Sequence, residues 1–298
     1  MQTLRLAAIV VLFFVGLALR HWKVLDVGHG RRLLTIVIWI GLPAVILAGV
    51  SRLPLHSQLL WLPAAAVLTI LIGCTLALVV GRRLNLEPSA YGAFVCCFTA
   101  LNISLIYPFV FAAHGAEGFA QVALFDLGNA TMLCTFGYLL AARLGRTANS
   151  WWQALQRLGS FPPLWALTLA LIINLFALPV SAVALDTLQL LGGWVVLLVP
   201  VALGVLFDGR RALSTPALTA VGLHLVIGLT MAVVCAVLLG LPGLTRTVAI
   251  IGCSAPIGFT VVVLAQRESL DVELAASAAS LSVLMGLFYI PLTLVWLG

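Results

Sequence analysis

Charged residues are scarce in this 298-residue chain. Asp, Glu, Lys and Arg together make up 8% of it, whereas they make up about 25% of an average soluble domain. Hydrophobic residues make up 63%, and the mean hydropathy is +1.21. A soluble domain cannot cover so much apolar surface, so the chain is expected to lie in a lipid bilayer. At about 20 residues per spanning helix, its length allows roughly ten spans and no separate soluble domain.

The sequence also lacks the cysteine pattern of a disulfide framework or a metal site. All six cysteines lie inside apolar segments, and no CxxC pair occurs, so they are interpreted as small core residues. We therefore expect no metal and no cofactor. The formal net charge of +6 comes from residues between apolar runs, which indicates membrane topology and excludes nucleic acid as an expected partner.

Strands of alternating polarity, which a membrane barrel requires, are absent, so the expected fold class is an all-α polytopic membrane protein. Residues 4–19 resemble a signal-peptide core, but no small-residue cleavage site follows them, and we interpret the segment as a retained first helix. Apolar runs predict ten helices, at 4–20, 32–50, 59–81, 90–113, 117–143, 162–179, 185–207, 214–240, 245–266 and 272–297.

The basic residues predict an orientation. Twelve of the 15 Lys and Arg residues lie in loops after odd-numbered helices, and only Arg5, Arg52 and Arg246 lie on the other side. Under the positive-inside rule the odd loops are cytoplasmic. Both termini are then expected on the opposite face, outside the cytoplasm.

The polar stretch 144–160 divides the predicted helices five and five. An odd number in each half means that the second half enters from the opposite side, which predicts inverted repeats over about 1–143 and 161–298 with a cytoplasmic linker at 144–160. Prolines occupy corresponding places in the halves: Pro43 matches Pro200, and Pro108 matches Pro256. We treat residues 1–298 as one membrane transport domain.

The fourth and ninth predicted helices carry small or hydrogen-bonding residues just before a mid-span proline. Pro108 and Pro256 are each expected to break or kink the helix, and Ser254 to cap a new half-helix. Two helix N-termini near the bilayer centre would favour a carboxylate without a buried Arg or Lys. The alternative for each proline is a simple kink.

Two ionisable residues lie within predicted spans. A charged Asp126 costs about 2.5–3.5 kcal/mol near the bilayer centre, so its expected role is proton acceptor, cation ligand or hydrogen-bonded pin between helices. His224 is either a proton carrier or a bridge between helices. With Asn129 and Gln266 they form the ion-coupling candidates, and the sequence leaves proton, sodium and uncoupled transport open.

Two other function classes were weighed. An intramembrane hydrolase would use Ser254 as nucleophile and His224 as base, but no third group that orients the base is evident, and we do not expect an enzyme. A non-transporting scaffold or receptor stays an alternative, although it needs no interrupted helices.

Several segments resemble the auxin efflux carrier family in its bacterial branch, within the superfamily of bile acid/sodium symporter-like proteins. The most specific stretch is 249–291, with its Pro256-Ile-Gly-Phe break, followed by residues 265–277 and Pro291. Further matching segments are Leu42-Pro43-Ala44, Glu117-Gly118, Leu124-Phe125-Asp126 with Asn129, and Phe161-Pro162-Pro163.

The resemblance implies a ten-helix inverted repeat with crossed, broken helices 4 and 9, and transport of small organic anions such as auxin, malate, malonate or lactate. It implies that the substrate site includes Asn102, Pro108, Ser254, Pro256 and Gly258, to which we add Ser104. The chain departs from the family in lacking two glycines between Asn102 and Pro108, which are six residues apart instead of seven. The sequence thus predicts an alternating-access carrier whose partners are the anion and the bilayer, with a homodimer left open.

Overall fold

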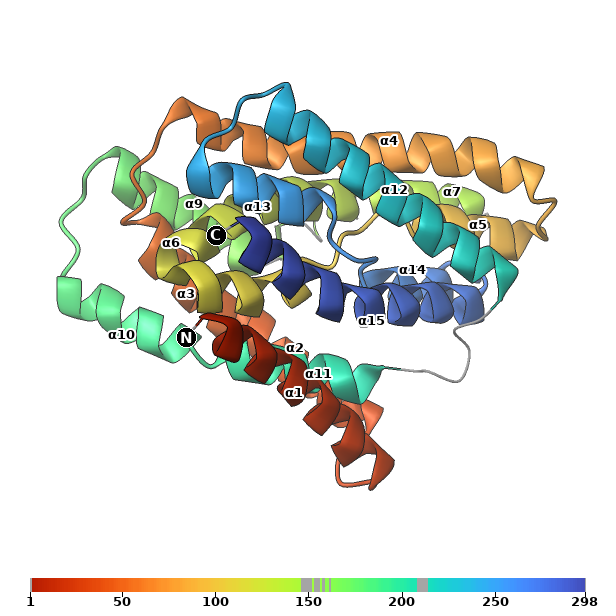
Figure 1. Cartoon of the computed structure of the whole chain (residues 1–298), viewed down its shortest axis with the longest axis horizontal. Coiled ribbons are helices and arrows are strands. Elements are labelled where there is room, and N and C mark those ends of the chain that lie inside the picture. The colour runs from red at the N-terminus through yellow and green to blue at the C-terminus, as the bar shows by residue number, and fades with distance from the viewer. Residues whose placement is uncertain are drawn as a thin grey trace.

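The computed structural model describes residues 2–145, 152, 156, 159–160, 162–207 and 214–297, and it is helical throughout (Figure 1). Its principal elements are α1 (Gln2–His21), α2 (Val27–Ile36), η1 (Val37–Gly41), α3 (Leu42–Val50), η2 (Ser57–Leu60), α4 (Trp61–Arg83), α5 (Pro88–Cys96), α6 (Ile103–Met132), η3 (Leu133–Gly137), α7 (Tyr138–Leu144), α9 (Pro162–Leu175), α10 (Ala182–Gly192), α11 (Val195–Leu206), α12 (Thr215–Val237), α13 (Gly243–Cys253), α14 (Thr260–Arg267) and α15 (Val272–Leu297). The predicted linker 144–160 falls largely outside the described residues.

Seven helical segments of the described chain are long and apolar enough to cross a membrane. They are Thr3–His21, Val27–Val50, Ser57–Arg83, Ile103–Leu144, Ala182–Leu206, Thr215–Val237 and Val272–Leu297. The shorter helices Pro162–Leu175 and Gly243–Cys253 are also apolar. These features confirm an all-helical polytopic membrane protein.

The difference between seven segments and ten predicted helices has a structural cause. Residues 103–144 form one segment of 42 residues, about 63 Å at the α-helical rise and twice the hydrocarbon thickness of a bilayer. Gly115 interrupts it with φ 62° and ψ −150°, so two helices are joined there. The sixth predicted helix ends early, at Leu175, and the ninth is broken after Cys253.

Other helix boundaries also depart from the sequence-based prediction. The second helix begins at Val27, five residues earlier than expected, because Asp26 caps it: the Asp26 Oδ1 accepts a hydrogen bond from the backbone N–H of His29 at 2.9 Å. The same hydrogen bond lowers the pKa of the exposed Asp26 carboxyl below its usual value. The predicted helix 185–207 is two helices, α10 and α11, separated at Gly193.

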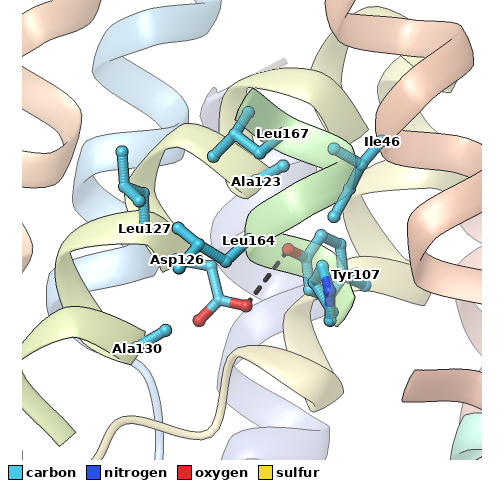
Figure 2. Close-up of a pocket in the computed structure, with 9 residues that line it drawn as sticks. Ile46, Tyr107, Ala123, Asp126, Leu127, Ala130, Leu164 and Leu167 are labelled. Carbon is cyan, nitrogen blue, oxygen red and sulfur yellow. Dashed lines mark hydrogen bonds between the residues drawn. The ribbon is translucent and has the colours of Figure 1, made fainter. Parts of the chain in front are cut away.

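The helices pack as two bundles. The first bundle consists of α1, α2, α3, α9, α10 and α11, and the second consists of α4, α5, α7 and α12 to α15. Helix α6 contacts both, through α1, α3 and α11 on one side and α4, α13 and α15 on the other. Figure 1 shows the first bundle along the left and bottom and the second bundle across the top and right. Where α6 meets α3 and α9, side chains surround a narrow cavity (Figure 2).

Candidate functional site

Two helices of the second bundle are broken, and their breaks meet. Helix α5 ends at Cys96 and α6 begins at Ile103; α13 ends at Cys253 and α14 begins at Thr260. The intervening segments 97–102 and 254–259, here called the crossing, are joined by an antiparallel bridge between Leu101 and Ile257.

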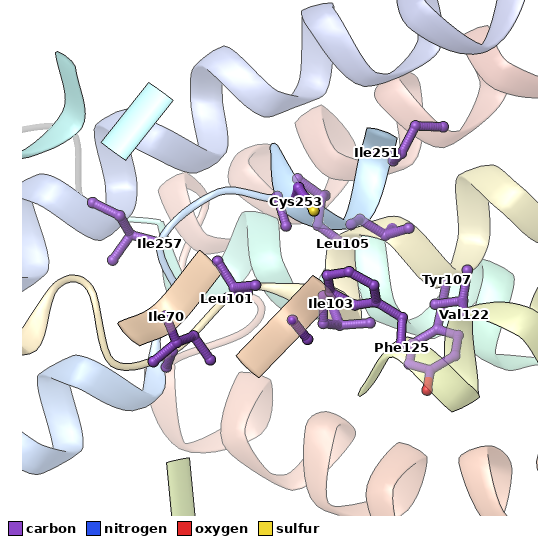
Figure 3. Packing of buried hydrophobic residues seen from close by; sticks show 14 of the residues in the cluster. Ile70, Leu101, Ile103, Leu105, Tyr107, Val122, Phe125, Ile251, Cys253 and Ile257 are labelled. Atoms are coloured by element: carbon purple, nitrogen blue, oxygen red, sulfur yellow. The ribbon is translucent and has the colours of Figure 1, made fainter. Parts of the chain in front are cut away.

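Hydrogen bonds hold the two segments of the crossing together. The backbone N–H of Asn102 donates to the Pro256 carbonyl at 2.7 Å, and that of Gly258 donates to the Ala100 carbonyl at 2.9 Å. Leu101 and Ile257 lie among the buried apolar side chains of this region (Figure 3). The breaks that the sequence predicts in both segments are therefore present.

Glycine permits the close approach at the crossing. A Cβ at Gly258 would lie 3.2 Å from the Ala100 Cβ and 3.3 Å from its carbonyl oxygen, and a Cβ at Gly286 of α15 would overlap the Pro256 ring. Small residues at such contacts let helix backbones approach in membrane proteins.

The structure corrects where the half-helices begin. Pro108 lies inside α6 as its sixth residue, and the helix starts at Ile103 with Asn102 as its N-cap: the Asn102 Oδ1 accepts from the Leu105 N–H at 3.2 Å. Ser104 is the second residue of α6 and is partly exposed. An amide cap at Asn102 satisfies an end group of the helix, which is why the break precedes the proline.

The predicted role of Ser254 as an N-terminal cap is wrong. Ser254 is the C-cap of α13, and its hydroxyl donates back to the Ile250 carbonyl at 2.8 Å. Pro256 lies within the break, and the next half-helix starts four residues later, at Thr260. A serine can donate to a preceding carbonyl as readily as it accepts from a following amide, and this choice depends on the tertiary structure.

Side chains from two long helices satisfy the bridging residues. The Asn129 Oδ1, on α6, accepts from the Leu101 N–H at 3.0 Å, and its Nδ2 donates to the Leu101 carbonyl at 3.4 Å. The Ser282 Oγ, on α15, accepts from the Ile257 N–H at 2.9 Å. The sequence analysis missed Ser282, because a serine in an apolar helix is equally typical of packing.

Asp126 is linked to the crossing through Asn129. The Asn129 Nδ2 donates to the Asp126 Oδ1 at 2.8 Å. The Tyr107 hydroxyl donates to the Asp126 Oδ2 at 3.2 Å, and Figure 2 shows this second bond. Two candidates from the sequence, Asp126 and Asn129, are thus brought together, and Tyr107 joins them as a residue that the sequence did not single out.

The cavity beside Asp126 lies between α6 and the first bundle. Its lining comes from α6, α3 and α9 and consists of Ile46, Tyr107, Ala123, Asp126, Leu127, Ala130, Pro163, Leu164 and Leu167. Its volume of about 10 Å³ corresponds to about one water molecule. Most of its wall is apolar, so the Asp126 carboxyl is the main polar feature.

Asn102 carries an unpaired donor. Its side chain is 5% exposed, and its Nδ2 has no hydrogen-bond partner in the described part of the chain. The sequence contains no Lys or Arg between positions 84 and 142 or between 247 and 266. The start of α6 therefore offers a neutral donor beside the positive end of a helix.

The remaining candidates lie elsewhere. The His224 Nε2, on α12, is 2.8 Å from the Ala255 carbonyl oxygen, so this side chain contacts the second break. Within the described residues no hydrogen bond joins His224 to the Ser254 hydroxyl, and no cluster of three His, Cys, Asp or Glu forms a metal site. Gln266 is exposed in the last turn of α14.

Comparisons with known proteins give a general role. No protein-family profile matches the chain. The chain is 29% identical over 290 residues to an "uncharacterized transporter" of Methanothermobacter thermautotrophicus, which covers 96% of this chain and 95% of that protein. It is 25% identical over 295 residues to an "uncharacterized transporter" of Methanocaldococcus jannaschii, covering 95% of each. Similarity along the whole length supports a transporter role for this membrane protein.

Proposed function

We propose that this protein is a secondary transporter of small organic anions that binds its substrate at the crossing. The observation that carries the proposal is the unpaired Asn102 Nδ2 at the start of α6. A buried donor without a partner costs about 1–3 kcal/mol, which a carboxylate oxygen would recover. The N-terminus of α6 adds roughly half a positive charge, so a carboxylate is favoured over a neutral or cationic solute.

The described contacts also support an inverted repeat. Leu101 is held by Asn129, 28 residues later, and Ile257 is held by Ser282, 25 residues later. In the proposed ten-helix arrangement these side chains come from the fifth and tenth helices, which are counterparts. We propose on this basis the architecture of the auxin efflux carrier family, with odd loops cytoplasmic and both termini periplasmic in an inner membrane.

The two bundles provide the moving parts of an alternating-access mechanism. The second bundle carries the crossing, and the first bundle contacts it mainly through α6. Near Asp126 this interface is formed by apolar side chains of α3 and α9, which can slide without breaking salt bridges. Movement of the second bundle against the first would expose the crossing to one face of the membrane and then the other.

Proteoliposomes that contain the full chain test this function. We expect uptake of at least one of radiolabelled malonate, malate and lactate, and we expect Asn102→Ala to lower its rate at least tenfold. The matched control is Thr230→Ala, because the exposed Thr230 hydroxyl donates only to Val226 of its own helix. Absence of uptake for all three anions, or full uptake by the Asn102 variant, would contradict the proposal, and a scaffold would give the first result.

A further inference from the structure

We propose that the Asp126 carboxyl binds the proton that couples transport to a proton gradient. This inference rests on the proposed function and adds the coupling ion. It starts from the position of Asp126 on α6, where its carboxyl lines a cavity against α3 and α9 of the first bundle.

No basic group faces this carboxyl in the described structure. The elements that line the cavity, α3, α9 and this part of α6, contribute one other titratable side chain, Tyr107. The rest of α6 and the other elements packed against it carry the following ionisable residues, none of which lines the cavity: His114 and Glu117 of α6, Cys134 of η3, Arg5, Arg20 and His21 of α1, Cys74, Arg82 and Arg83 of α4, Arg246 and Cys253 of α13, and Glu273 and Tyr289 of α15. A carboxylate buried without a counter-charge is costly, and binding a proton removes that cost.

The ligand set fits a proton and not a metal cation. Hard cations bind several oxygen atoms, whereas the polar atoms around Asp126 are the Tyr107 hydroxyl and the Asn129 amide, both donating to it. The rest of the wall is apolar, and the cavity has room for about one water molecule. That water can bring a proton to Asp126 and remove it.

Protonation of Asp126 reverses its hydrogen bond with Tyr107 and leaves its hydrogen bond with Asn129 in place. A hydronium ion delivers a proton to the Asp126 Oδ2 and is left as water, and the new O–H donates to the Tyr107 oxygen, whose own hydrogen turns away from the carboxyl. The Asn129 Nδ2 still donates to the Oδ1, and Asn129 still holds Leu101 at the crossing. The charge at the interface thus changes while the link to the substrate site persists, and the proton returns to water on the opposite side.

Infrared difference spectroscopy of the purified chain tests the proton site without a substrate. We expect a pH-dependent carbonyl band of a buried carboxylic acid in the wild type, lost in Asp126→Asn. The band is expected to persist in Asp186→Asn, because Asp186 is a surface carboxyl paired with Arg52. A band that survives in Asp126→Asn would refute the inference. Asp126→Glu, which keeps a carboxyl, shows a shifted band and guards against loss of folding in the amide variant.

Proton-driven accumulation, in proteoliposomes, of whichever of the three anions is transported is the second test. With the membrane potential clamped at zero, one-to-one proton symport accumulates the anion up to about tenfold for each pH unit, and antiport does so with the gradient reversed. We expect wild-type accumulation in one orientation of the gradient, and only equilibration in Asp126→Asn. Full accumulation by that variant overturns the inference and leaves the transporter intact. A titrating Asp126 band without uptake of any carboxylate would instead refute the proposed function.

Discussion

Substitution of Asn129 by Ala is expected to loosen the crossing. The Asn129 side chain makes two hydrogen bonds to the Leu101 backbone and one to Asp126. Interhelical hydrogen bonds in membrane proteins average about 0.6 kcal/mol, so the two to Leu101 contribute about 1.2 kcal/mol. The substitution also leaves the buried N–H of Leu101 without an acceptor. Leaving a buried donor unpaired costs about 1–3 kcal/mol. We therefore expect a loss of about 2–3 kcal/mol in the free energy of unfolding.

Thermal unfolding in detergent measures this loss. In chains of somewhat smaller size, each kcal/mol lost from the free energy of unfolding lowers the unfolding midpoint by about 2–4 °C. The midpoint of Asn129→Ala should therefore fall by roughly 5–10 °C. Asn129→Asp keeps the acceptor for Leu101 but sets a second carboxyl against Asp126, so it should be less stable at pH 8 than at pH 5. Thr230→Ala serves as the control and should stay within about 1 °C of the wild type. A midpoint for Asn129→Ala equal to that control would refute the assigned role of Asn129.

Two further variants test the packing of the crossing. Gly286→Val places a side chain against the Pro256 ring. We expect this crowding to lower the free energy of unfolding by at least about 2 kcal/mol, measured by thermal unfolding. A midpoint equal to that of the wild type would contradict this packing. Ser282→Ala leaves the Ile257 N–H without its acceptor and should lower the free energy of unfolding by about 1–3 kcal/mol. Ser282→Thr keeps the hydroxyl and should recover most of this loss. Equal unfolding midpoints for the two variants would contradict the assigned hydrogen bond.

Hydropathy predicts the helical membrane class because the requirement to satisfy backbone groups in lipid is independent of tertiary contacts. The prolines at 108 and 256 also predict that two segments are broken. The location of the first break is not predictable from Pro108, since the N-cap at Asn102 and the bridge to the other break decide it. The boundary predicted between residues 113 and 117 agrees with the structure, because Gly115 interrupts the helix there with a positive φ.

The sequence identifies part of the candidate site. Asp126 and Asn129 are three residues apart and therefore share one face of a helix, so their proximity is predictable. Their partners are not, since Tyr107 lies 19 residues before Asp126 and Leu101 lies 28 before Asn129. The first contact depends on how the chain turns at Gly115, and the second depends on where the crossing places Leu101. The same is true of Ser254, whose hydroxyl direction is set by the helix that it closes.

The most direct test of the account is an experimental structure of the protein with a transported carboxylate bound. The account predicts density for the carboxylate at the start of α6, with an oxygen within hydrogen-bonding distance of the Asn102 Nδ2. Density for the transported anion at any other place, with the Asn102 amide still unpaired, would contradict it.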